Sequence, residues 1–285
     1  MTQDSGHIEF RPIRREDRER LLAIATRVWE GHDYLPAVFD RWVDQPGTYF
    51  GGLELDGQLV GCGRVQRFDS RRGWLEALRV DPDAQRRGLG REMSRHVVRT
   101  ALAMGLQELM FSTYFDNLAS MSISEGFGFR RIATFTHLEL EKPNERPAPP
   151  PSPDAARVRI AAGLPDVTGF VRNDWLFVPA DAPDLARRFP HARTVTDGAC
   201  TLMLCDNTKY PGWLEIGWLD APGGDVPGAC LDAVLETARA EGREGVHLML
   251  PAGMQLAPFS ERGFGFFERE GDVYLYSARA DELRI

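Results

Sequence analysis

The alternation of hydrophobic and polar residues predicts both strands and helices in the first half of the chain. Period-two alternation at 8–12 is typical of a strand, while apolar residues at helical spacing predict helices from Arg15 to about Trp29 and after Pro36. The dipeptide Asp56-Gly57 between two apolar segments is a strong hairpin signal. The remaining predicted elements are strands at 49–55, 58–66 and 73–80, a helix at 88–104, a strand at 109–113, a helix from Leu118 and strand material at 129–141.

A proline-rich segment divides the chain. Residues 142–153 read KPNERPAPPPSP. Proline lacks the amide donor and fixes φ, so this segment is expected to be an extended linker rather than a helix or a central strand. At 285 residues the chain is longer than one average domain. We therefore predict a first domain at 1–142, a linker at 143–154 and a second domain at 155–285.

The second half repeats the order of the first. Leu214-Glu215 matches Leu75-Glu76, and Glu215 follows Glu76 by 139 residues. The run RGFGF at 262–266 matches EGFGF at 125–129 at nearly the same offset, and a helical stretch and an apolar strand lie between the two anchors. This order favours a tandem duplication. An unrelated α/β domain with a chance match stays open as the alternative.

Composition and charge narrow the class of protein. The formal net charge of −8 argues against a protein that binds nucleic acid through its phosphates. No apolar run approaches the roughly 20 residues that a membrane helix needs, and the N-terminus carries no basic-then-apolar signal, so we expect a soluble cytoplasmic protein. Four scattered cysteines without a C-x-x-C pair are expected to be buried thiols, and we expect no metal site.

The segment QRRGLG at 85–90 lies between an apolar strand pattern and a long helical pattern. Amides that converge at a helix N-terminus offer unpaired N–H donors and the positive end of the helix dipole to an anion. Gly88 and Gly90 allow a ligand to approach the backbone closely. The layout therefore predicts a phosphate-binding loop.

This loop resembles motif A of the GNAT acetyltransferase superfamily, Q/R-x-x-G-x-G/A, and residues 117–129 resemble the family's N-x-x-A-x-x-x-Y-x-x-x-G-F stretch. The resemblance implies an α/β (α+β) GNAT fold, with a central mixed, mostly antiparallel sheet flanked by helices. Here it implies two tandem copies, the second of them degenerate. It also implies acetyl-CoA as co-substrate. The cofactor-binding residues so predicted are Leu78, Arg79, Val80, Gln85, Arg86, Arg87, Gly88, Leu89, Gly90, Arg91, Asn117 and Ser120.

Acetyl transfer to an amine needs a neutral nucleophile and a proton for the departing thiolate. Glu76, on the strand before the loop, is the predicted base, acting directly or through water. The family often has tyrosine where this chain has Ser124, so the proton donor departs from the pattern. Ser124 and the nearby Tyr114 are both kept as candidates. A solvated charge at a strand edge stays open as the alternative for Glu76.

The acceptor site is expected in the first helices. The segment at 29–42 combines two tryptophans, a tyrosine and acidic residues around a helix break, and Trp29, Asp33 and Tyr34 are the predicted substrate-binding residues. This segment also has a short resemblance to the vertebrate-type histidine N-acetyltransferases. Core packing of its aromatic residues is the open alternative, and His32 is expected to be a surface histidine.

We therefore expect an N-acetyltransferase that moves an acetyl group from acetyl-CoA to a primary amine of a small molecule or amino acid by direct transfer. A non-catalytic acyl-CoA sensor or partner-binding module and a protein N-acetyltransferase are the alternatives. In the second half, residues 220–225 read DAPGGD where the first has the arginine loop, so one CoA per chain is expected. The expected form is a monomer or homodimer without nucleic-acid or membrane partners.

Overall fold

The structure is a computed structural model that describes residues 6–28, 31, 33–146, 152 and 154–285. The chain forms two compact units. Unit 1 comprises the residues up to Phe111, Asn117–Arg130 and Tyr276–Ile285, and unit 2 comprises Ser112–Asp116 and Arg131–Leu275. Each unit is described by itself.

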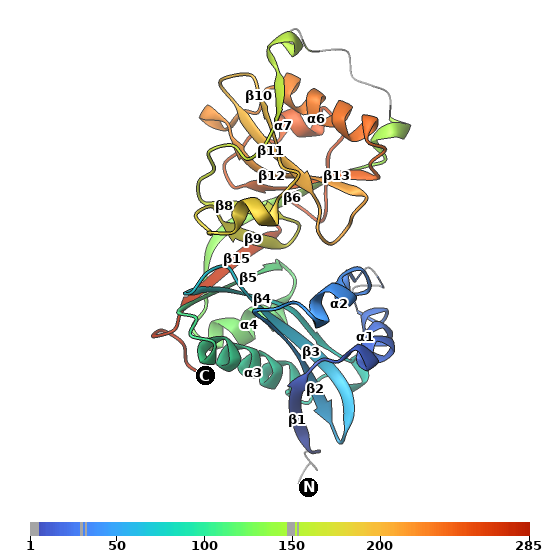
Figure 1. Ribbon diagram of the computed structural model, residues 1–285, viewed down its shortest axis with the longest axis vertical. Helices are drawn as coiled ribbons and strands as arrows, with labels where there is room; N and C mark the ends of the chain where they lie inside the picture. Colours follow the sequence, from blue (N-terminus) through green and yellow to red (C-terminus); the bar gives the residue numbers. More distant parts are fainter. Residues whose placement is uncertain (1–5, 29–30, 32, 147–151, 153) are drawn as a thin grey trace. The chain divides into compact units, whose positions relative to one another are not determined.

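Unit 1 contains a sheet in the order β1-β2-β3-β4-β5, antiparallel except for the last pair (Figure 1). Helices α1 and α2 pack with Cys62 of β3 in one apolar cluster, whereas a Cβ at the adjacent Gly63 would meet Met93 and Val97 of α3. Because successive strand residues face opposite sides, the helices cover both faces of the sheet. The elements are β1 (Ile8–Pro12), α1 (Arg18–Ala25), α2 (Leu35–Val43), β2 (Thr48–Leu55), β3 (Gln58–Arg67), β4 (Arg72–Val80), α3 (Leu89–Ala103), β5 (Glu108–Tyr114) and α4 (Leu118–Gly126).

Unit 2 repeats this topology with the order β7-β10-β11-β12-β13, followed by β6. Its parallel pair β12–β13 flanks helix α6, as the pair β4–β5 flanks α3. A separate hairpin, β8–β9, and the one-turn helix α5 occupy the chain positions of α1 and α2. The elements are β6 (Arg130–Glu141), β7 (Arg159–Ala162), β8 (Phe170–Asn173), β9 (Leu176–Pro179), α5 (Leu185–Arg188), β10 (Arg193–Thr196), β11 (Thr201–Asp206), β12 (Trp213–Asp220), α6 (Gly228–Ala240), β13 (Gly245–Pro251), α7 (Ala257–Ser260), β14 (Gly265–Phe266) and β15 (Val273–Arg279).

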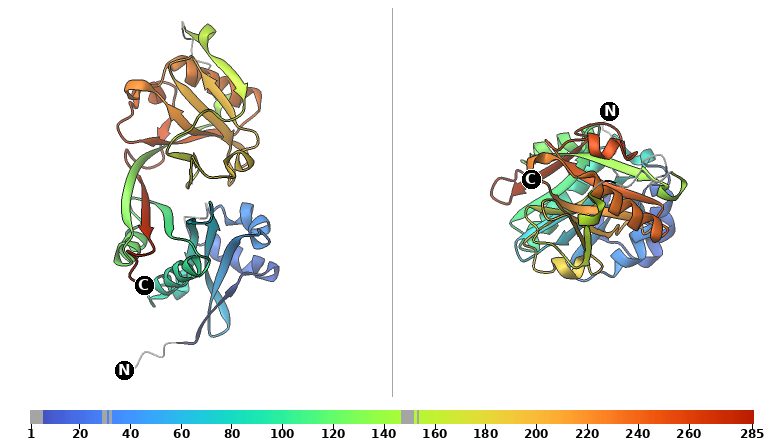
Figure 2. Two further views of the ribbon diagram at one scale, coloured as in Figure 1. Left: turned by 60° about the vertical axis from the view of Figure 1, so that its left-hand side comes forward. Right: turned by 90° about the horizontal axis from the view of Figure 1, so that it is seen from above.

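The two copies exchange their last strands. Strand β6, which ends the first copy, pairs with β13 in unit 2, while the chain's last residues group with unit 1. There the Tyr276 hydroxyl donates to Glu125 at 2.8 Å, and the Arg284 amide donates to the Phe127 carbonyl at 2.9 Å. Figures 1 and 2 both show the C-terminus beside α4. The division at 1–142, 143–154 and 155–285 stays a prediction about the two sequence copies, since the compact units interleave along the chain.

The predicted fold class, a GNAT-type mixed sheet flanked by helices in two tandem copies, is confirmed. The predicted helix from Arg15 to about Trp29 is shorter than expected, because Arg15–Asp17 is a 3-10 turn and α1 ends at Ala25. The amides of Arg27 and Val28 donate to carbonyls three residues earlier, which tightens the last turn. Within the described ranges, every helix is too short or too polar to cross a membrane. All four cysteines are buried and free.

Candidate active site

The predicted phosphate loop leads directly into helix α3. Gly88 is the N-cap with φ +80°, and Arg86 also has a positive φ of 61°. The amides of Arg91 and Glu92 donate to the Gly88 carbonyl. The amides before them belong to the first turn, where an α-helix leaves N–H groups without an internal partner. Gln85, Arg86, Arg87 and Gly88 are exposed, and a Cβ at Gly88 would meet nothing within 4 Å. The loop therefore presents an open helix N-terminus flanked by two exposed arginines.

Acidic residues before the loop are ion-paired with arginines of helix α1 and of the turn that follows it. The buried Asp81 carboxylate is ion-paired with Arg20 and Arg27, and Arg27 also pairs with Asp83 at 2.7 Å. Asp81 further accepts the Asp83 amide at 3.0 Å, which fixes the turn that precedes the loop. These contacts hold the loop against α1 and offset the negative charge beside the proposed anion site.

The helix arginines divide between two roles. Arg91 is exposed, yet its guanidinium lies 4.9 Å from the ring centroid of Phe127 at the C-terminus of α4. Arg95 lies 5.7 Å from the same centroid and is ion-paired with Glu92. A cation at a helix C-terminus is favourable because of the helix dipole. These contacts join α3 to α4, and the role predicted for Arg91 at the phosphates stays a prediction.

Glu76 is a buried, ion-paired carboxylate of strand β4. Its side chain is 5% exposed and is ion-paired with Arg64, which is 1% exposed. Gln66 donates to the same oxygen, Oε1, at 2.7 Å. The alternative of a solvated charge at a strand edge is therefore wrong. Sequence reasoning missed Arg64 and Gln66, although the predicted antiparallel strands 58–66 and 73–80 carried the signal, since Arg64 lies directly opposite Glu76.

A bulge follows Glu76. The register of β3 against β4 shifts between Cys62 and Arg64, and opposite this shift Ala77 has φ +59°. The Cys62 thiol donates to the Ala77 carbonyl at 3.3 Å. A non-glycine residue in the left-handed region is a strained conformation that redirects the backbone. The parallel register of β4 with β5 extends only from Arg72 to Trp74, so the predicted cofactor residues Leu78, Arg79 and Val80 lie on a stretch of β4 beyond that pairing.

Asp33 and Tyr34 gather around Arg79. The Asp33 carboxylate accepts from Arg79 Nε at 2.6 Å and from the Leu35 amide at 2.9 Å, and its side chain is 1% exposed. The Tyr34 ring lies 5.2 Å from the Arg79 guanidinium and packs edge-on against Trp42 at 5.8 Å. Burial acts to lower the pKa of Arg79, but Tyr34 and Asp33 outweigh it and raise that pKa. Asp33 thus anchors the segment before α2 to strand β4, while Trp29 and His32 lie outside the described residues.

The second predicted block forms helix α4. Asn117 is its N-cap, and the side-chain oxygen of Asn117 accepts the Ser120 amide at 3.3 Å. Ser124 is half-buried, and its carbonyl accepts the Phe127 and Phe129 amides, which closes the end of the helix. Tyr114 ends β5, in the segment that groups with unit 2. Burial, with Asp116 and Glu268, raises the pKa of the Tyr114 hydroxyl.

The loop before α6 in unit 2 is also exposed, but it carries aspartates where the loop of unit 1 carries arginines. At the start of α6, Arg262 Nε donates to the Gly228 carbonyl at 3.1 Å and to Asp232 at 2.7 Å. Asp232 also accepts the Ser152 hydroxyl at 2.5 Å, so side chains of unit 2 occupy this helix N-terminus. Asp220 and Asp225 are exposed on the loop that precedes it.

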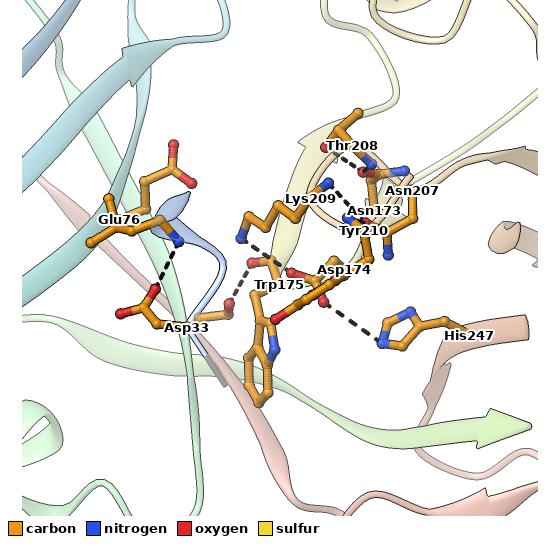
Figure 3. Close-up of polar contacts among 12 residues, drawn as sticks. Asp33, Glu76, Asn173, Asp174, Trp175, Asn207, Thr208, Lys209, Tyr210 and His247 are labelled. Atoms are coloured by element: carbon orange, nitrogen blue, oxygen red, sulfur yellow. Dashed lines mark hydrogen bonds and ion pairs between the residues drawn. The ribbon is translucent and has the colours of Figure 1, made fainter. Parts of the chain in front are cut away.

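The counterpart of Glu76 in unit 2 has a different partner. Glu215 is fully buried, and both of its carboxylate oxygens accept from His247 Nδ1, at 2.7 and 2.8 Å. Glu215 on β12 is paired in register with His247 on the parallel strand β13. Burial lowers the pKa of His247, but Glu215 outweighs that effect and raises it. Figure 3 shows Asp174 between His247 and Lys209, with Lys209 Nζ 3.2 Å from Asp174 Oδ2.

The region around the loop and Glu76 is similar to a known family. Residues 12–129 match the model of the acetyltransferase (GNAT) family. This match confirms the resemblance of the loop and of residues 117–129 to that family, and it supports an N-acetyltransferase.

Similar proteins cover the first copy or the whole chain. The N-alpha-acetyltransferase RimI of Mycobacterium tuberculosis is 28% identical over 136 residues, which are 46% of this chain and 84% of that protein. A GCN5-related N-acetyltransferase from Sphaerobacter thermophilus has a TM-score of 0.66 at 13% identity and covers 95% of each chain. A tandem GNAT protein from the clavulanic acid biosynthesis pathway has a TM-score of 0.63 at 17% identity, covering 96% of this chain and 99% of that one. The two structures show that the tandem GNAT fold extends over both copies.

Proposed function

We propose that the protein transfers an acetyl group from acetyl-CoA to a primary amine of a small molecule or amino acid, by direct transfer between the two bound substrates. The observation that carries this proposal is the open N-terminus of α3 at Gly88, preceded on the chain by the bulged strand that holds Glu76. An anion at such a terminus is stabilised by the first amides and by the helix dipole. The relative named as an N-alpha-acetyltransferase supports an amine acceptor.

The cofactor is proposed to bind unit 1 alone. The pyrophosphate would lie on the amides of 86–90, with Gln85, Arg86, Arg87 and Arg91 around it. The backbone of Leu78, Arg79 and Val80 would hold the pantetheine and the acetyl carbonyl, because this part of β4 extends beyond its pairing with β5. The amide side chain of Asn117 and the hydroxyl of Ser120 would contribute at the start of α4. We expect one acetyl-CoA per chain, since Arg262 occupies the corresponding helix N-terminus of unit 2.

In the proposed reaction the amine nitrogen attacks the thioester carbonyl carbon, the C–S bond breaks and the CoA thiolate takes up a proton. An ammonium group must lose a proton before it attacks, and Glu76 would accept that proton directly or through water. Glu76 is tied to Arg64 and Gln66, so relay through water requires less rearrangement than direct contact. Ser124 or Tyr114 would supply the proton to the thiolate, and Trp29, Asp33 and Tyr34 would border the acceptor.

The test is release of free CoA thiol from acetyl-CoA in the presence of amino acids, polyamines, aminoglycosides and a peptide with a free N-terminus. We expect thiol release with at least one small amine, and a large loss of kcat in Glu76→Gln with little change in acetyl-CoA affinity. Glu54→Gln is the matched control, because Glu54 is also an ion-paired strand carboxylate of unit 1, bound to Arg11.

Four outcomes would contradict the proposal in different ways. Binding of acetyl-CoA without thiol release for any amine would favour a non-catalytic acyl-CoA sensor. Activity on the peptide but on no small amine would favour a protein N-acetyltransferase. Equal turnover of Glu76→Gln and Glu54→Gln would remove Glu76 from the mechanism. Titration calorimetry that counts two equivalent acetyl-CoA molecules per chain would contradict the assignment of the cofactor to unit 1 alone.

A further inference from the structure

Arg64 is a fully buried cation at the centre of unit 1. It lies on strand β3, and its side chain is 1% exposed. Its two terminal nitrogens have separate partners: Nη1 donates to Glu76 Oε1, and Nη2 donates to Gln45 Oε1 at 2.7 Å. The guanidinium also lies 4.2 Å from the centroid of the Trp42 ring. One side chain therefore joins the end of helix α2 to the carboxylate of strand β4.

Such a site is costly to build and needs an explanation. Removing a guanidinium from water costs several kcal/mol, which only well-placed partners recover. The penalty is visible here, because burial lowers the pKa of Arg64 although Glu76 acts to raise it. Among the described residues, Arg64 Nε is a buried donor without a hydrogen-bond partner. An apolar residue would fill the same space without these costs, so stability alone does not account for a cation at this position.

The geometry around Glu76 gives the explanation. Arg64 and Gln66 extend from the same face of β3, and both donate to Oε1 of Glu76. Two donors that meet one oxygen fix the torsion of the carboxylate as well as its position. The other charged or titratable groups that act on this pair are Arg41 and Tyr34, both from the segment of helix α2. Arg64 forms a direct ion pair with Glu76.

We propose that Arg64 is a positioning residue for acetyl transfer: it holds the Glu76 carboxylate in its working orientation and couples that orientation to the Gln45–Trp42 end of helix α2. This inference rests on the proposed role of Glu76 as base. Arg64 itself transfers no proton, and it acts on the reaction through Glu76. Helix α2 follows the predicted acceptor residues in the chain, so a change there would reach the base through Arg64.

The test compares Arg64→Gln, Arg64→Lys and the control Arg11→Gln. The control removes a half-buried arginine of unit 1 that is ion-paired with Asp17 and Glu54. In Arg64→Gln we expect kcat to fall about 10²-fold, the loss typical of a misplaced reacting group, with an unchanged KM for acetyl-CoA. Removing a cation beside a carboxylate favours its protonated form, so the acid limb of the pH–rate profile should move to higher pH.

Arg64→Lys separates charge from orientation. Lysine keeps the positive charge but cannot contact Glu76 and Gln45 through a planar fork. We expect this variant to keep the acid limb of the parent while losing kcat, and we expect Arg11→Gln to keep both. Parent kcat in Arg64→Lys, or an equal shift of the acid limb in Arg64→Gln and Arg11→Gln, would overturn the proposal. Where Arg64→Gln fails to fold, the kcat of Arg64→Lys decides.

A readout independent of turnover separates this inference from the proposed function. The carboxyl carbon signal of Glu76 can be followed by NMR with 13C-labelled glutamate and assigned with Glu76→Gln. Its titration should move to higher pH in Arg64→Gln and not in Arg11→Gln. If the signal moves but no amine is acetylated, the proposed function fails while the anchoring of Glu76 stands. If amines are acetylated but neither the signal nor kcat changes, Arg64 is only structural.

Discussion

Two glycines at opposite ends of helix α3 provide a matched test of the cofactor loop. Gly88 and Gly105 have φ of +80° and +84°, and a Cβ at either would meet nothing within 4 Å. Alanine at each position therefore meets the same obstacle, a left-handed backbone that costs an L-residue roughly 1–2 kcal/mol. We expect Gly88→Ala and Gly105→Ala to lose about the same stability without ligand. Only Gly88 lies in the proposed pyrophosphate site.

The expected difference appears when acetyl-CoA is added. At a concentration 100 times the parent Kd, one bound ligand stabilises a protein by about 2.7 kcal/mol. A tenfold weaker Kd at the same concentration leaves about 1.4 kcal/mol. For a chain of this size, with roughly 2–4 °C of Tm per kcal/mol, the ligand should raise Tm by about 5–11 °C in the parent and in Gly105→Ala. In Gly88→Ala the rise should be about 3–6 °C.

Thermal unfolding with and without acetyl-CoA measures these shifts, and titration calorimetry gives the Kd values directly. Acetyl-pantetheine, which lacks the pyrophosphate, is the second ligand and should not distinguish the two variants. An equal acetyl-CoA shift in Gly88→Ala and Gly105→Ala would refute the assignment of the pyrophosphate to the loop. A difference with acetyl-pantetheine as large as with acetyl-CoA would show that Gly88 acts on some other part of the cofactor.

Three further predictions concern the stability of each unit. Asp33→Ala leaves the Arg79 guanidinium buried without its carboxylate and should lower the free energy of unfolding in urea by about 3–5 kcal/mol. The double variant Asp33→Leu with Arg79→Met should recover part of this loss. If the losses of the two single variants simply add up in the double variant, the pairing is contradicted. Burial is the main cause, and the neighbouring His247 the second cause, of a His137 pKa well below its usual value. At about pH 6 the unfolded chain therefore protonates this histidine more readily than the folded chain does, and the stability of the fold decreases as pH drops below about 6.5. His137→Phe should flatten this acid slope by up to about 1.4 kcal/mol per pH unit, and an unchanged slope between pH 5 and 7 would refute the assignment. At Gly228 a Cβ would overlap the Arg262 guanidinium, so Gly228→Ala should displace Arg262 and destabilise unit 2 by about 1–3 kcal/mol, whereas Gly265→Ala, with open space around it, should not.

The parts of the fold that depend on local pattern were predictable from the sequence. The strand at 8–12 coincides with β1, and the predicted helix at 88–104 differs from α3 by one residue at each end. Alternation and helical spacing record which side of an element is buried, and Gly88 marks a positive φ that side chains rarely adopt. The loop was predictable for the same reason, since strand, glycine turn and helix follow one another along the chain.

The partners within the site were not predictable from local pattern. Arg64 and Glu76 are 12 residues apart, and Asp33 and Arg79 are 46 apart, so each pair depends on the register or packing of separate elements. The pairing of Asp33 with Arg79 could not be foreseen, because a lone carboxylate in sequence gives no sign of the arginine that binds it. The exchange of β6 and the last residues between the units also leaves no local signal, because a strand pattern does not specify which sheet it joins.

The two copies show how the same position in a fold can carry different chemistry. Glu76 and Glu215 lie on the corresponding strands β4 and β12 of the two units, and both carboxylates are buried. In unit 1 the partner is an arginine, which cannot give up its proton, and the open loop at Gly88 lies farther along the chain. In unit 2 the partner is a histidine, and Arg262 occupies the helix N-terminus. The buried acid therefore does not depend on the loop, because that carboxylate is held by its own strand neighbours.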